Sequence, residues 1–213
     1  MLKLFYAPGS CALASHIALE EAVAAGAAGA AYEAVRLDLS AGDQRRSDYL
    51  AINAKGRVPA LVADRGILTE TPAILAWVAQ SFPAARLAPQ DDPHAFAVMQ
   101  AFNSYLCSTV HVAHAHGARG TRWADDPVAI ADMKRKVPET MAACFELIET
   151  EMLAGPWVMG AAYSVADPYL YTVTRWLERD GVDPARFPRV ADHRARMEAR
   201  PAVAKVLAVQ YPS

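Results

Sequence analysis

Strand-like segments are confined to the first 82 of the 213 residues, and this uneven distribution constrains the fold more than any other feature. Short apolar runs occur at residues 2–7, 30–39, 58–64 and 66–70, while residues 10–25 and 71–82 have helical composition. Residues 42–53 are polar and predict a short helix or a loop. The resulting order, β-α-β-α-β-β-α, is typical of a small α/β domain.

Beyond residue 90 the chain contains no strand-like segment and predicts helices only. Helical patterns cover residues 94–119, 125–155, 164–181 and 189–210, with Pro138 inside the second. We therefore predict an α/β domain over residues 1–82 and an all-helical domain over residues 90–213.

Composition excludes several classes of protein. A net charge of −2 gives no electrostatic reason to expect nucleic acid or a membrane surface as a partner. No apolar stretch reaches the ~18 residues of a membrane span, and no secretory signal pattern is visible. The three widely spaced cysteines, Cys11, Cys107 and Cys144, indicate a reducing compartment. We expect a cytoplasmic protein.

Cys11 follows the turn Pro8-Gly9-Ser10 at the start of the first predicted helix. If Ser10 caps this helix, Cys11 occupies its first position, where free N–H groups and the helix dipole lower the pKa of a thiol. The same helix end can instead stabilise the thiolate of a bound ligand. A free cysteine is also common as a small buried residue, so all three interpretations stay open.

Two other places combine turn chemistry with polar groups. A cis Val58-Pro59 bond would turn the N–H and C=O of Val58 toward a peptide-like ligand. Thr71 is a natural N-cap for the helix over 71–82, with Pro72 at its first position. A ligand bound at this helix start would place its ammonium group against Glu70 and its carboxylate against Thr71 and the helix amides. The structural alternatives are an ordinary proline and a well-capped helix.

A cluster of three histidines invites a metal interpretation. His111 and His114 can share one helix face, but His116 points away from His114. No carboxylate completes a ligand set, so we expect no metal. Arg119 and Arg122 are either solvated charges at a helix end or contacts for an anionic substrate.

Taken together, Cys11, Val58-Pro59 and Glu70-Thr71 in this β/α order resemble the thioredoxin-like half of a glutathione transferase. The all-helical second half agrees, as does the capping-box spacing in "SVADPYL". "KLFYAPGSCALASHIAL", "YLAINAKGRVPAL" and "ADPYLYTVTRW" are similar to the bacterial beta class, in which a cysteine lies beside the glutathione sulfur. This resemblance covers nearly the whole chain. It implies an α/β thioredoxin-like N-terminal domain followed by an all-α C-terminal domain.

The resemblance also implies roles for individual residues. Those near the glutathione sulfur would be Cys11, able to form a mixed disulfide, with Ser10, Tyr6 and His111. Those that bind the rest of glutathione would be Arg57, Val58, the cis proline Pro59, Glu70 and Thr71. His114 and Trp176 would line the acceptor pocket.

Two departures from the family pattern stand out. Thr71 occupies a position that is usually serine, which keeps the hydroxyl. The lysine expected to hold the glycyl carboxylate has no clear match, and Arg36, Arg45 and Arg57 are the alternatives.

The activity implied is conjugation of the glutathione thiolate, as co-substrate, to small hydrophobic electrophiles by a homodimer. The resemblance also allows thiol–disulfide exchange through Cys11 beside this conjugation. The alternatives are a glutathione-dependent disulfide reductase, a dehalogenase, or a non-catalytic binding member of the fold.

Overall fold

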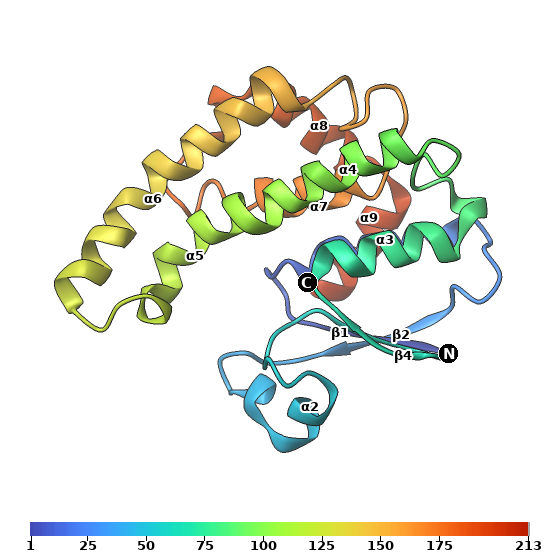
Figure 1. Ribbon diagram of the computed structural model, residues 1–213, viewed down its shortest axis with the longest axis horizontal. Helices are drawn as coiled ribbons and strands as arrows, with labels where there is room; N and C mark the ends of the chain where they lie inside the picture. Colours follow the sequence, from blue (N-terminus) through green and yellow to red (C-terminus); the bar gives the residue numbers. More distant parts are fainter. Residues whose placement is uncertain (213) are drawn as a thin grey trace.

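The computed structural model describes residues 1–212, and its strands all lie before residue 70, as the sequence predicts. The strands are β1 (Leu2–Tyr6), β2 (Tyr32–Arg36), β3 (Ala60–Ala63) and β4 (Gly66–Thr69). The α-helices are α1 (Ala12–Ala24), α2 (Ser47–Ile52), α3 (Thr71–Ser81), α4 (Pro93–Tyr105), α5 (His111–Arg119), α6 (Pro127–Leu147), α7 (Ala166–Thr174), α8 (Pro188–Glu198) and α9 (Pro201–Gln210). Figure 1 shows α2 on one side of the sheet and α3 with the later helices on the other.

The sheet has the order β2-β1-β3-β4, with β1 parallel to β2 and antiparallel to β3. Strands β3 and β4 form the predicted hairpin. Successive side chains of a strand face opposite sides, so β1 serves two cores. Leu2 and Leu4 join the large core beneath α1 and α3, while Phe5 packs against Tyr49 of α2. This is the thioredoxin-like arrangement that was expected.

Helix α1 is enclosed, and every residue from Ala12 to Ala22 is buried. It packs against α3 in the first half of the chain and against α7 and α9 in the second. Its two glutamates form ion pairs with the last helices, Glu20 with Lys205 at 2.6 Å and Glu21 with Arg200 at 2.6 Å. Helix α1 is thereby held between the two halves, and Cys11 lies directly before its first residue.

Helix α7 occupies the centre of the helical half, and all nine of its residues are buried. The capping box that the Ser164–Asp167 spacing predicts forms in part, because the Ser164 hydroxyl bonds the Ala166 N–H and not the Asp167 N–H. Asp167 Oδ2 accepts the Ser164 N–H at 2.7 Å, and Ser164 Oγ accepts the Ala166 N–H at 3.3 Å.

Two predicted helical segments form with details that the sequence pattern did not specify. The segment over 94–119 is helical throughout, and a π-helical turn over Leu106–Val110 lies between α4 and α5. Pro138 lies inside α6, as the pattern over 125–155 predicts. No helix within residues 1–212 combines the length and the apolar character needed to cross a membrane.

Candidate active site

The turn before α1 brings Ser10 and Cys11 to the junction of the two halves. Ser10 Oγ donates to the Ala7 carbonyl at 2.7 Å and accepts the Ala12 N–H at 3.3 Å. The α-helix begins at Ala12, one residue later than predicted, so Cys11 precedes its first residue. The Cys11 backbone is nevertheless helical, with φ −62° and ψ −13°. Ser10 therefore bonds a first-turn amide, but from two residues before the helix.

The Cys11 thiol is buried, with 9% of the residue exposed, and it donates to the Val58 carbonyl at 3.6 Å. Burial raises the pKa of this thiol, and the nearby Cys107 adds to the rise. The Thr71 hydroxyl and the Arg119 charge act in the opposite direction but do not outweigh burial. The interpretation in which the helix end lowers the Cys11 pKa is therefore wrong for the free protein.

The Val58-Pro59 peptide bond is cis, as the sequence suggested. The Val58 carbonyl faces the Cys11 thiol, and Val58 lies before the first paired residue of β3, Ala60. The preceding residue, Arg57, is fixed by its backbone, since its carbonyl accepts from Tyr49 Oη at 2.6 Å and from the Asn53 side chain at 2.7 Å. This loop therefore presents a backbone edge beside the thiol.

The start of α3 differs in detail from the prediction. Glu70 is the residue before the helix, Thr71 is its first residue, and no side chain caps it. Thr71 is thus not the N-cap, and Pro72 is the second helical residue. Glu70 has a φ of +73°, a backbone region that non-glycine residues rarely adopt and that is concentrated at functional sites. Its carboxylate pairs with Lys55.

Three aromatic rings of the helical half pack together beside the Cys11 turn. The Trp176 indole N–H donates to the Gly9 carbonyl at 3.1 Å, which ties the end of α7 to the turn. His114 stacks on Trp176 with ring centroids 4.2 Å apart, and His111 lies 5.0 Å from the same indole. The His114 Nδ1–H donates to the two Asp180 carboxylate oxygens at 2.7 and 2.9 Å.

His111 is kept neutral by its surroundings. Its pKa is lowered to about 4, mainly by burial and also by the nearby charges of His114, Arg119, Arg122 and Arg57. A neutral imidazole has one N–H donor and one acceptor, so His111 can donate to an anionic sulfur at neutral pH without carrying a charge.

The structure does not bring Tyr6 into this group of contacts. Its ring packs against His16 of α1, with centroids 5.0 Å apart, and only 3% of the residue is exposed. The third histidine of the sequence cluster also points elsewhere, because His116 stacks on Trp123. Within residues 1–212 no three His, Cys, Asp or Glu side chains are placed to hold a metal ion.

Comparison with known proteins identifies the family. The glutathione S-transferase N-terminal domain model matches residues 1–80, and the glutathione S-transferase C-terminal domain model matches residues 125–201. Glutathione S-transferase GstA of Escherichia coli O157:H7 is 31% identical over 98% of each chain. The chain belongs to the glutathione S-transferase family.

Solved structures of this family agree along the whole chain. A glutathione transferase homologue from Sulfitobacter, crystallised with bound glutathione, is 48% identical, with a TM-score of 0.91 over 97% of this chain and 96% of that one. The bacterial beta-class glutathione S-transferase of Sphingomonas chungbukensis is 32% identical, with a TM-score of 0.83 over 99% and 100% of the two chains. The resemblance stated from the sequence is therefore confirmed at the level of the family and its fold.

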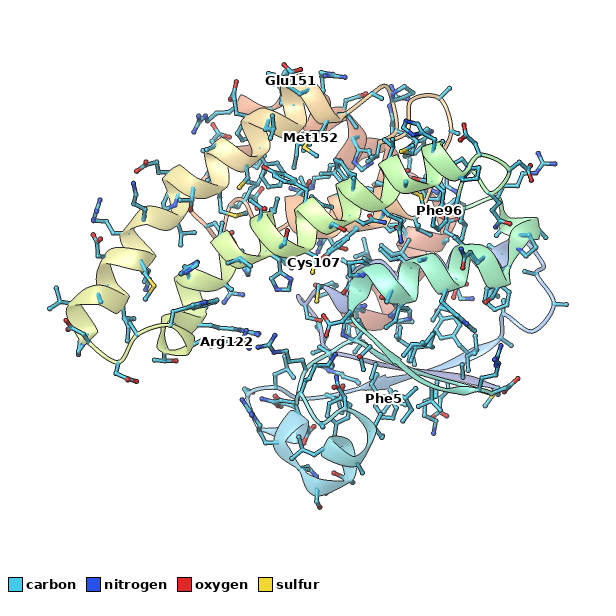
Figure 2. All side chains as sticks on the ribbon, viewed as in Figure 1. Phe5, Phe96, Cys107, Arg122, Glu151 and Met152 are labelled. Carbon is cyan, nitrogen blue, oxygen red and sulfur yellow. The ribbon has the colours of Figure 1, made fainter. Side chains whose placement is uncertain are left out.

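Within this glutathione S-transferase framework, sequence reasoning missed three residues that the structure brings to the site. Lys55 donates to Thr69 Oγ1 at 2.7 Å and pairs with Glu70, although only arginines had been considered as the basic residue. Cys107 lies near Cys11, and Figure 2 shows it on the turn between α4 and α5, over the first residues of α3. Asp180 holds His114. Of these three residues, only Lys55 could have been recognised from the sequence, because it lies within the quoted stretch "NAKGRVPAL".

Proposed function

We propose that this protein is a glutathione transferase that conjugates glutathione to small hydrophobic electrophiles. Residues 1–82 would hold glutathione, and residues 90–213 would supply the surface for the second substrate. The observation that carries this proposal is the meeting of the Cys11 thiol with the Val58 carbonyl, in a chain of this family.

Each part of glutathione has a complementary group. The Val58 N–H and C=O can pair with the cysteinyl backbone of glutathione as an added strand. The γ-glutamyl carboxylate would meet Thr71 and the first amides of α3, because a helix N-terminus favours an anion. The γ-glutamyl ammonium would meet Glu70. Lys55 or Arg57 would then hold the glycyl carboxylate.

The chemistry required is ionisation of the glutathione thiol. An unperturbed thiol, with a pKa near 8.5, is only a few per cent thiolate at neutral pH, and lowering the pKa by about two units takes roughly 2.7 kcal/mol. A Cys11 thiol that stays protonated can donate a hydrogen bond to that thiolate, as can neutral His111. In this arrangement Cys11 is a donor, and glutathione carries the nucleophile.

Glutathione binding can be tested at Glu70. Glu70→Gln removes the charge that would meet the ammonium, and we expect calorimetry to show at least tenfold weaker binding of reduced glutathione. Glu33→Gln is the matched control, since Glu33 is a similarly exposed ion-paired glutamate on β2. Absence of heat with the wild-type protein at millimolar glutathione would defeat the proposal.

A second activity follows from Cys11 itself. Its thiolate can attack one sulfur of oxidised glutathione, forming a Cys11–glutathione disulfide and releasing one glutathione thiolate. Intact-protein mass spectrometry after incubation with oxidised glutathione should then show one added glutathionyl group that Cys11→Ala abolishes. Because the Cys11 pKa is raised, we expect this gain to be slow at neutral pH, and an unchanged mass would leave conjugation alone. Substrate assays separate the disulfide reductase, dehalogenase and non-catalytic alternatives.

We further propose that the protein acts as a homodimer in the cytoplasm, following the family. Size-exclusion chromatography with light scattering tests the assembly, and a single monomeric species would contradict it.

A further inference from the structure

Four arginines from both halves of the chain gather around one position. Arg45 and Arg57 flank α2, Arg119 ends α5, and Arg122 follows in a 3-10 turn. Arg45, Arg57 and Arg119 all act on Arg122, whose pKa is lowered by burial first and then by these like charges. Figure 2 shows Arg122 below α5, on the side of the helical layer that faces the lobe carrying α2.

These arginines have no acidic partner. Within residues 1–212, no carboxylate lies within 4.0 Å of the guanidinium group of any of the four, and the same holds for seven other arginines; the paired ones are Arg46, Arg135, Arg194, Arg196 and Arg200. The four differ from the other unpaired arginines because three of them act on the fourth, Arg122, from both halves of the chain. The C-terminal end of α5 favours a cation at Arg119, but this does not account for Arg45 and Arg57 from the other half. Like charges that face one another are stabilised by a bound anion.

The arginine group adjoins the reacting centre. Arg119 and Arg122 lower the pKa of His111, whose ring packs against Trp176, and the Arg119 charge reaches the Cys11 thiol. The acidic groups on this side are already engaged: the Glu70 carboxylate pairs with Lys55, and the Asp180 carboxylate holds His114. An anion bound by Arg119 and Arg122 would therefore lie beside the glutathione sulfur, and it would meet arginine charges that no carboxylate neutralises.

We propose that the acceptor substrate is an electrophile that carries a carboxylate, which Arg119 and Arg122 bind. This inference rests on the proposed transferase function and names its substrate class. Arg57 remains available for the glycyl carboxylate of glutathione, whereas Lys55 pairs with Glu70. In the reaction, the thiolate sulfur forms a bond to the electrophilic carbon, the leaving group departs with its bonding electron pair, and the thiol proton passes to solvent.

A matched pair of electrophiles tests the proposal. 4-Chloro-3,5-dinitrobenzoate and its methyl ester differ in the charge, and chloride leaves from both. With kcat/KM divided by the uncatalysed rate constant for each compound, we expect the wild-type enzyme to prefer the acid by about tenfold or more.

Variants of the two arginines locate the effect. Arg119→Gln and Arg122→Gln should each lower the acid-to-ester ratio several-fold, and the double variant should bring it close to one. Arg135→Gln is the matched control, because Arg135 is an exposed arginine on α6 that pairs with Asp132. We expect the control to keep the wild-type ratio and the KM for glutathione to stay similar in all variants.

Three results would overturn the inference: a ratio near one in the wild type, a ratio that the double variant leaves unchanged, or a raised KM for glutathione as the main effect. If neither compound is turned over, calorimetry with the two glutathione conjugates decides. Tighter binding of the acid conjugate that depends on Arg119 and Arg122 supports the proposal, and equal binding contradicts it. Failure to bind glutathione at all would instead defeat the proposed function.

Discussion

Two histidine–carboxylate pairs in the helical half use the same chemical groups in different surroundings. His193 Nε2–H donates to Asp167 at 3.1 Å, and both side chains are fully buried. His114 Nδ1–H donates to Asp180 at 2.7 Å, but 14% of the histidine side chain is exposed, and its ring stacks on Trp176 beside the Cys11 turn. One pair lies inside the core, and the other lies at the candidate active site.

The difference between the pairs lies in what else each carboxylate does. Asp167 also accepts the Val158 N–H, the Ser164 N–H and the Ser164 hydroxyl, so its acceptor capacity serves the capping of α7 and the loop before it. Asp180 accepts from His114 alone among the hydrogen bonds of residues 1–212. A carboxylate with many backbone partners stabilises the fold, whereas one with a single ring partner orients that ring.

The largest expected effect is on the buried pair. Asp167→Ala removes the acceptor of four hydrogen bonds in a site closed to water, so we expect a loss of about 3–5 kcal/mol of unfolding free energy, or a Tm lower by roughly 10 °C. Urea unfolding followed by circular dichroism measures this loss. Asp167→Asn should fall in between, because it keeps one acceptor oxygen.

Asp192→Ala is the matched control for that loss. Asp192 pairs with Arg196 on α8 at 2.9 Å, and 58% of its side chain is exposed. We expect a change within about 0.5 kcal/mol, because exposed ion pairs contribute little. A loss as large as that of Asp167→Ala would show that burial is not the cause.

A third histidine, His16, sharpens the comparison because no carboxylate of residues 1–212 bonds its ring. His16 packs between Tyr6 and Tyr32, and its Nδ1 accepts from the Gln210 amide at 3.0 Å. Its pKa is lowered to about 4, because burial outweighs the opposing charge of Glu20. His16 is therefore neutral in the folded protein near neutral pH.

This lowered pKa predicts a loss of stability in acid. As the pH falls from about 6.5 to about 4, the unfolded chain takes up a proton that folded His16 does not, so the free energy of unfolding decreases. The contribution, up to about 3 kcal/mol, is fully present above pH ~6.5. Urea unfolding from pH ~7.5 to ~4.5 should show a shallower decrease for His16→Asn, which keeps an acceptor for Gln210. Equal decreases in the two proteins would assign the acid sensitivity to other groups.

Patterns among neighbouring residues were enough to predict the fold and the capping role of Asp167, the carboxylate of the buried pair. Apolar runs and turn residues predicted the four strands, and the Ser164–Asp167 spacing predicted the box that begins α7. These features depend on residues a few positions apart. The prediction for the start of α3 was wrong by one residue, because the rare backbone angle of Glu70 moves the N-cap position to that residue.

The arrangement of the candidate site could not be predicted in the same way, because it depends on contacts between residues that are far apart in the sequence. His114 and Asp180 lie 66 residues apart in the chain, and Lys55 and Glu70 lie 15 apart. The direction of the Cys11 pKa shift could not be decided from the sequence for the same reason. A helix end lowers the pKa of an exposed thiol, but packing from both halves buries this one and reverses the direction.

The smallest of these effects belongs to the His114–Asp180 pair. Asp180 holds His114, His114 stacks on Trp176, and Trp176 donates to the Gly9 carbonyl, so the carboxylate positions the turn that carries Cys11 without touching it. We expect Asp180→Ala to lower kcat/KM with a carboxylate-free electrophile about tenfold, roughly 1.4 kcal/mol, and to change stability less than Asp167→Ala.

Rescue distinguishes this positioning role from a general loss of packing. Asp180→Asn keeps an oxygen that accepts the His114 Nδ1–H, so its kcat/KM should stay within about threefold of the wild type. Asp183→Ala serves as the control, because Asp183 lies three residues further on, where it caps an exposed turn by accepting the Ala185 N–H at 2.9 Å. If Asp180→Asn loses as much activity as Asp180→Ala, then charge rather than ring orientation matters. If neither variant loses activity, this pair is structural like the Asp167 pair, and the contrast between the two disappears.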